Sequence, residues 1–260
     1  MAAQLHLLWS FIFDTHFSFP QNHIATEQIM LRWLHFIFGI IWIGLLYFFN
    51  LVGFPTMKQL EASVRAKVYP VLMSRAMNWF RWSALVTVVV GLRYFWMILA
   101  ADAQNSGNSG LAIRWFGEWL AVWLVAYGLI YPFQLPSKGL LDNRWVRAIS
   151  IAIIVIAASW IVLDLNGGPQ SSNGHLCISV GGGIGFLMLL NTWGVVWRVQ
   201  KKLIEWTRLA VEHGTPMPPE AERLARWGYI ASRVGFWLSF PMLFFMGAAD
   251  HYPFLSSITD

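Results

Sequence analysis

The stretch RWLHFIFGIIWIGLLYFFN (Arg32–Asn50) lies inside an apolar run that extends from residue 28 to residue 54. At about 1.5 Å of rise per residue, a helix of this length crosses a lipid bilayer. Two ionisable residues, Arg32 and His35, interrupt the run. Such residues are costly at membrane depth, usually face a protein interior and often mark function. The stretch therefore predicts a membrane-spanning helix with a functional face.

On a helix, Arg32, His35, Gly39 and Trp42 form one stripe, because they follow one another at steps of three, four and three. Gly39 lies one turn from His35 and leaves room for a flat or bulky group close to the backbone. The stripe suits a bound macrocycle or metal. It also fits a plain helix–helix contact in which His35 bonds a neighbouring side chain.

The composition is that of an integral membrane protein. Of the 260 residues 57% are hydrophobic and only 12% are charged, against about 25% charged residues in ordinary soluble domains. Mean hydropathy is +0.53. Long apolar spans separated by short polar loops predict an all-α bundle in a lipid bilayer rather than a barrel of alternating strands. The net charge of +5 does not indicate nucleic-acid binding, because the basic residues are distributed by topology.

The single cysteine, Cys177, excludes an internal disulfide, a cysteine-based zinc site and a CxxCH attachment site for c-type haem. The N-terminus has no basic segment and no small-residue cleavage site, so we expect no cleavable signal peptide. Residues 5–13 are apolar but too short to span a bilayer, and we expect them to lie at the membrane interface.

Six membrane spans are predicted, at residues 28–52, 79–100, 114–134, 145–163, 176–197 and 229–249. Between the last two spans, a basic amphipathic helix is expected over Lys201–His213, and a further helix starts at Glu220. The fifth span contains a glycine cluster at positions 181, 182, 183 and 185. No charged or hydroxyl partner follows at P-loop spacing, so the cluster predicts close helix packing rather than phosphate binding.

Most of the 18 Lys and Arg residues lie in the segments that join spans one and two, three and four, and five and six. The positive-inside rule places these segments in the cytoplasm. Both termini are then on the outer, periplasmic side of the cell inner membrane. The predicted organisation is an outer N-terminal tail, a six-helix transmembrane domain and a short outer C-terminal tail, over residues 1–27, 28–250 and 251–260.

This topology gathers ionisable residues in the outer half of the membrane: His23, His35, Arg93, Glu118, Asp164, His175, Asp250 and His251. A b-type haem needs one or two imidazoles on its iron, and its propionates favour basic partners at a membrane edge. His35 and His251 are therefore candidate axial ligands. Arg32 and Arg93 are candidate propionate partners, with Gly39 and Trp42 beside the cofactor.

Plainer explanations exist for the same residues. Arg93 and Glu118 could form only a buried ion pair, and His251 could be an interfacial residue before Pro253. A proton or ion pathway would also use ionisable residues. It would need them across the whole membrane, whereas the inner half offers little beyond Asn191 and Arg233.

Two segments carry a family resemblance. RWLHFIFGIIWIGLLYFFN with the following GFPTMK resembles the first helix of the membrane domain of bacterial membrane-bound urate oxidases, the urate hydroxylase family. LNTWGVVWRVQKKLIEW and SRVGFWLSFPMLFFMGAADHYPF resemble that family's closing pattern, in which a helix ends in a histidine followed by an aromatic residue and proline. His35 and His251 fall in the two motifs.

The family is a multi-helix membrane domain fused to a C-terminal cytochrome c domain. The resemblance therefore implies an oxidoreductase of the cytoplasmic membrane that passes electrons to a c-type cytochrome, with urate as the implied substrate. This sequence contains no CxxCH. We expect the electron carrier to be a separate subunit, unless electron transfer has been lost.

The leading hypothesis is a six-helix oxidoreductase or electron-transfer subunit that binds haem b near its outer face. An alternative is a non-catalytic structural subunit of a larger respiratory or photosynthetic membrane complex, in which the 16 tryptophans pack against other membrane subunits, pigments or lipids. A transporter is a third possibility. The sequence lacks the paired, broken half-helices that transporters often show.

Overall fold

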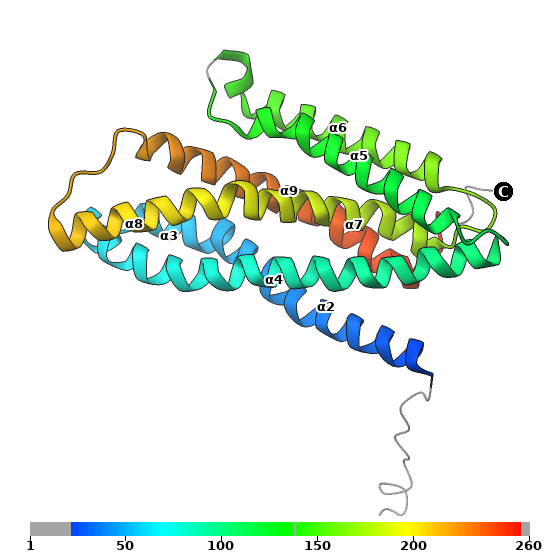
Figure 1. The fold of residues 1–260 in the computed structure, drawn as a ribbon. Helices are drawn as coiled ribbons and strands as arrows, with labels where there is room; N and C mark the ends of the chain where they lie inside the picture. The colour runs from blue at the N-terminus through cyan, green and yellow to red at the C-terminus, as the bar shows by residue number, and fades with distance from the viewer. Residues whose placement is uncertain (1–21, 138, 256–260) are drawn as a thin grey trace, which may run out of the picture.

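The computed structural model describes residues 22–137 and 139–255, and every regular element there is helical (Figure 1). In chain order the elements are α2 (His23–Tyr47), η1 (Phe48–Gly53), α3 (Phe54–Gln59), α4 (Ala62–Asn105), α5 (Leu111–Gln134), η2 (Gly139–Asp142), α6 (Arg144–Asn166), α7 (Asn173–Asn191), η3 (Thr192–Val196), α8 (Trp197–His213) and α9 (Ala221–His251). Within the described ranges, six helical stretches are long and apolar enough to cross a membrane. The predicted all-α bundle of six spans is confirmed, while the expected interfacial segment at residues 5–13 lies outside the described residues.

Two spans extend well beyond their predicted ends. The second span is the 44-residue helix α4, which takes in part of the polar segment that precedes the apolar run. The fifth continues from α7 through η3 into α8, which contains the predicted amphipathic helix. These extensions pack against each other, and the Tyr69 hydroxyl donates to Gln200 Oε1 at 2.5 Å. Tertiary contacts therefore stabilise helical turns that hydropathy alone would leave out.

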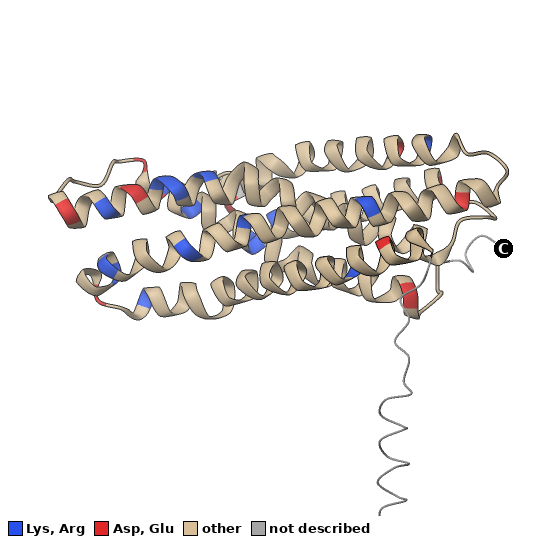
Figure 2. Ribbon diagram, turned by 60° about the horizontal axis from the view of Figure 1, so that its bottom comes forward, with Lys and Arg blue, Asp and Glu red and all other residues tan. Residues whose placement is uncertain are grey.

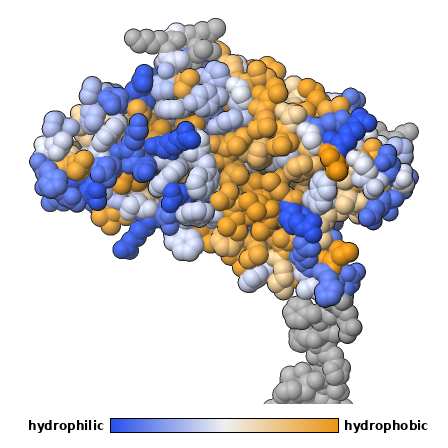
Figure 3. All heavy atoms as spheres, viewed as in Figure 1, coloured by the Kyte–Doolittle hydropathy of each residue, from blue (hydrophilic) through white to orange (hydrophobic). Residues whose placement is uncertain are grey.

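The bundle has two chemically different ends. One end holds the start of α4, the end of α8, the start of α9 and the 135–143 connection, and Figure 2 shows most Lys and Arg residues gathered toward it. We call it the basic end. The opposite end, here the neutral end, holds the 106–110 and 167–172 loops, which contain no Lys or Arg. Between the ends lies the apolar band seen in Figure 3, as expected for a protein surrounded by lipid.

The α7–α8 stretch is the centre of the bundle. In its most apolar window 72% of the residues are buried, against 44% in α9. Two glycines of the predicted cluster explain how the neighbouring helices come so close. A Cβ on Gly181 would lie 2.9 Å from Phe245 Cβ in α9, and one on Gly183 would lie 1.8 Å from Trp123 Cε2 in α5. The prediction that the cluster serves close helix packing is confirmed.

The two π-helical segments, η1 and η3, lie near α9. Asn50 in η1 donates from Nδ2 to Ser232 Oγ at 3.0 Å. Asn191, at the junction of α7 with η3, donates from Nδ2 to the Ala231 carbonyl oxygen at 2.8 Å. A π-turn frees backbone groups from the regular helical pattern, and here each one accompanies an amide side chain that ties the first or fifth span to α9.

The Gly183→Ala variant should be strongly destabilised, because its new methyl group would overlap the Trp123 indole. Overpacking of a protein core costs about 1–3 kcal/mol of folding free energy per site. The measurement is thermal unfolding of the detergent-purified protein. Gly128→Ala is the matched control, since a Cβ at Gly128 meets nothing within 4 Å. Equal melting temperatures for the two variants would contradict this account of α7 packing.

Candidate functional site at the neutral end

A buried carboxylate joins α4 to α7 at the neutral end. Asp102 lies one turn before the end of α4, and its side chain is 7% exposed. Its Oδ2 accepts hydrogen bonds from the backbone N–H of Ser172 at 2.8 Å, the Ser172 hydroxyl at 2.9 Å and His175 Nδ1 at 3.1 Å. Three donors converging on one oxygen are the environment that an ionised carboxylate needs away from water.

Local sequence explains why His175 meets Asp102. Ser172 is the N-cap of α7, and its hydroxyl accepts a hydrogen bond from the His175 backbone N–H at 3.2 Å. Serine is a favoured N-cap because its oxygen satisfies a free helical N–H. The cap places the first turn of α7, with His175 on it, directly against the last turns of α4.

The His175 side chain is completely buried. Its ring packs against Trp115, with centroids 4.9 Å apart, and against Phe95 at 6.2 Å. Nδ1 is engaged with Asp102, whereas Nε2 has no hydrogen-bond partner among the described residues. Buried polar atoms are nearly always paired, so an unpaired imidazole nitrogen beside a carboxylate is a strong candidate for a functional group.

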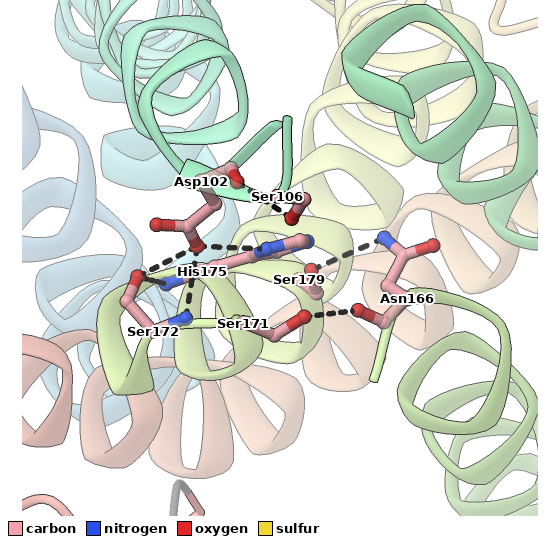
Figure 4. Close-up of polar contacts among 7 residues, drawn as sticks. All are labelled: Asp102, Ser106, Asn166, Ser171, Ser172, His175 and Ser179. Carbon is pink, nitrogen blue, oxygen red and sulfur yellow. Dashed lines mark hydrogen bonds and ion pairs between the residues drawn. The ribbon is translucent and has the colours of Figure 1, made fainter. Parts of the chain in front are cut away.

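Figure 4 shows a second set of polar contacts next to this pair. Asn166, the last residue of α6, donates from Nδ2 to Ser179 Oγ at 3.5 Å, and its Oδ1 is buried without a partner in the described structure. The Ser179 carbonyl oxygen accepts from the indole N–H groups of Trp119, at 2.9 Å, and Trp123, at 3.1 Å. One polar cluster thus links α4, α5, α6 and α7.

A cleft of about 400 Å³ opens beside the cluster, between the two neutral-end loops. Its polar lining consists of Asn105, Ser106, Gln170 and Ser171, and Trp115 also lines it. Trp115 therefore contacts the cleft and also packs on the His175 ring. The volume falls in the range of small-molecule sites, about 300–1,000 Å³.

The predicted stripe on the first span faces α4. His35 Nδ1 is 2.9 Å from the Thr87 carbonyl oxygen, and a carbonyl can only accept, so Nδ1 carries the hydrogen and Nε2 the lone pair. The ring lies over Gly91, where a Cβ would be 3.0 Å from His35 Cε1. A Cβ on Gly39 would lie 3.7 Å from Thr87 Cγ2, an ordinary van der Waals contact. Gly91 is therefore the small residue that makes room for the His35 ring.

Both predicted propionate partners are held by acidic residues. Arg32 Nη2 is 2.6 Å from Asp250 Oδ2 at the end of α9. Arg93 is held by both carboxylate oxygens of Glu27, at 2.7 and 2.9 Å. The alternative pairing of Arg93 with Glu118 is wrong, because Glu118 accepts instead from Arg114, one turn away on α5. All these pairs lie partly on the surface of the bundle.

The other predicted residues are dispersed. His251 is the last residue of α9 and is exposed. Trp42 is 2% exposed, and its indole N–H has no partner in the described part of the chain. The Arg32–Asp250 pair brings the neutral ends of α2 and α9 together, but no hydrogen bond or ring contact joins His35 to His251. Within the ranges described, no group of three or more His, Cys, Asp or Glu side chains is placed to hold a metal ion.

The sequence places His175 at the start of the fifth span, but no role was predicted for it. Asp102 was not among the predicted site residues. A usable signal existed: an aspartate near the end of one apolar span and a histidine near the start of another, both at the same membrane surface. What the sequence could not supply was the adjacency of α4 and α7, which are 73 residues apart at this contact.

Comparison with known proteins agrees with a membrane redox protein. A family model described as urate oxidase N-terminal matches residues 60–259, which is most of the chain. The match contains Asp102, His175 and His251 and begins after the Arg32–Asn50 stretch. No match was found among curated proteins or among solved structures.

Proposed function

Because the chain belongs to the urate oxidase N-terminal family, we propose that it is the membrane-bound part of an oxidoreductase that acts on urate or a related heterocycle at its neutral end. The observation that carries this proposal is the buried Asp102–His175 pair beside the neutral-end cleft. A carboxylate–imidazole pair with one free ring nitrogen suits proton transfer, and removing electrons from an N–H heterocycle also releases protons.

The neutral end faces the outside in this proposal. Lys and Arg residues accumulate at the basic end, which the positive-inside rule assigns to the cytoplasm. The first span begins and the last span ends at the neutral end, so an even number of crossings brings both to the outer side of the cell inner membrane. A separate c-type cytochrome on that side is the proposed electron acceptor.

The cleft between the neutral-end loops is the proposed substrate site. The amide groups of Asn105 and Gln170 can both donate and accept hydrogen bonds. The Ser106 and Ser171 hydroxyls already donate to the backbone carbonyl oxygens of Asp102 and Asn166, so they can accept from a ligand. This set complements a planar heterocycle that carries alternating N–H and C=O groups. Trp115 offers an indole surface for the ring of the substrate.

Asp102 sets the protonation pattern of His175. The carboxylate accepts from Nδ1–H, which leaves the lone pair on Nε2 and orients the ring, as carboxylates beside catalytic histidines commonly do. Nε2 is then the ring atom available to take up a proton, and Trp115 separates it from the cleft. Burial against Phe95 and Trp115 keeps water away from the nitrogen.

Haem b is the proposed electron carrier, and its fit to these residues is uneven. His35 has the arrangement usual for a metal-ligating histidine, with Nδ1–H donated to a backbone carbonyl and Nε2 left free. His251, at the exposed end of α9, is the proposed second ligand. Arg32 and Arg93 fit less well as propionate partners, because Asp250 and Glu27 already hold them. A bound haem would supply one-electron transfer between the substrate site and the cytochrome.

The activity test is urate-dependent reduction of externally added c-type cytochrome by sealed right-side-out vesicles that contain the protein. His175→Gln and Asp102→Asn should each lower kcat by about 10²-fold or more, the usual contribution of a general base. His213→Gln, at the exposed end of α8, should leave kcat unchanged. Thermal unfolding of each variant checks that it is folded; folded His175 and Asp102 variants with the wild-type rate would contradict the assigned role.

The haem assignment is tested by haem content per protein after expression with haem available. His35→Ala should lose most of the haem, because it removes the one oriented imidazole on the first span. His251→Ala should retain haem but with an altered visible absorption spectrum. His213→Ala is again the control. Full haem content in the His35 variant would reject His35 as a ligand.

A further inference from the structure

A long groove runs along the outside of the bundle between α6 and α9, with α7 at its base. Its volume is about 1,120 Å³. It extends from Arg144 and Arg233 toward the basic end to Asp164 and Gly167 at the neutral end. Arg144 and Asp164 are 20 residues apart on one helix, which corresponds to about 30 Å, the thickness of the hydrocarbon core of a bilayer. The groove therefore follows the direction of a lipid chain.

The middle of the groove is apolar. Its lining there comes from all three helices and includes Ile151, Val155, Val180, Ile184, Val234 and Leu238. Among the described residues that line it, none is a histidine, a methionine or a cysteine. A haem in this groove would find no histidine, methionine or cysteine for its iron, and the apolar lining suits hydrocarbon chains.

Three arginines line the groove toward its basic end: Arg144, Arg147 and Arg233. Arg147 and Arg226 lie on either side of Asp142, which pairs with both. In contrast, neither Arg144 nor Arg233 has a carboxylate partner within the described ranges. Each is placed instead by an aromatic ring: Arg144 Cζ is 5.4 Å from the Trp145 ring centroid, and Arg233 Cζ is 5.3 Å from that of Phe236.

We propose that this groove binds an anionic phospholipid, with its phosphate between Arg144 and Arg233 and its acyl chains along α7. Basic pockets between membrane helices are typical sites for anionic lipid head groups. General accumulation of basic residues at this end explains why arginines are present. It does not explain why three of them, Arg144, Arg147 and Arg233, line one apolar groove in which only Arg147 has a carboxylate partner among the described residues. The site is distinct from the Asp102–His175 cluster and does not depend on the proposed redox function.

The test is native mass spectrometry of the full-length, detergent-purified protein titrated with phosphatidylglycerol or with phosphatidylcholine of the same acyl chains. Phosphatidylglycerol should bind about tenfold more tightly or better, because only it presents a net negative head group to the arginines. The Arg144→Gln/Arg233→Gln double variant should lose this preference. Ala152→Trp, which fills part of the groove, should weaken binding of both lipids.

Arg75→Gln is the matched control, because Arg75 is an exposed arginine of α4 outside the groove. It should bind phosphatidylglycerol as the wild type does. Equal affinity for the two lipids would overturn the proposal. So would an equal loss in the Arg75 control and the double variant, which would indicate diffuse attraction to the basic end. Displacement of the lipid by millimolar inorganic phosphate would also contradict it, since the acyl chains would then contribute nothing.

Discussion

The backbone contact of α7 with its neighbours is the constraint on which the rest of the structure depends. At Gly183 the indole of Trp123 occupies the space where any side chain would begin. The same indole donates to the Ser179 carbonyl oxygen, which also accepts from Trp119. Lipid offers no hydrogen-bond partners, so close backbone approach and interhelical hydrogen bonds must hold membrane helices together.

The candidate site is built on this contact. His175 lies one turn before Ser179 on α7, so fixing α7 against α5 also fixes the imidazole between Trp115 and Phe95. Asp102 and the Ser172 cap then satisfy every donor that faces the carboxylate. Two acceptor atoms of the cluster, His175 Nε2 and Asn166 Oδ1, have no hydrogen-bond partner in the described structure. Because the other polar atoms of the cluster are paired, these two atoms are the ones available to exchange a proton or to bind a ligand.

The sequence predicted the parts of the fold that depend on local composition. Length and hydropathy located six spans, and the glycines at 181–185 correctly indicated close packing. Which helices are neighbours depends on tertiary packing, and errors began there. The alternative that Arg93 pairs with Glu118 is wrong, because its partner is Glu27, and the Asp102–His175 contact was not predicted. Helix order along the chain does not determine helix order around the bundle, so a histidine and an aspartate in different spans could not be matched in advance.

Electron transfer through this helical bundle is the central property that we propose for the protein. The most direct measurement is a potentiometric titration of the purified wild-type protein, followed by its visible absorption spectrum. We expect a one-electron transition in which the reduced protein shows the sharp α-band of a b-type haem. A spectrum that stays featureless at every potential, in protein prepared with haem available, would contradict the redox function while leaving the fold and the polar cluster in place.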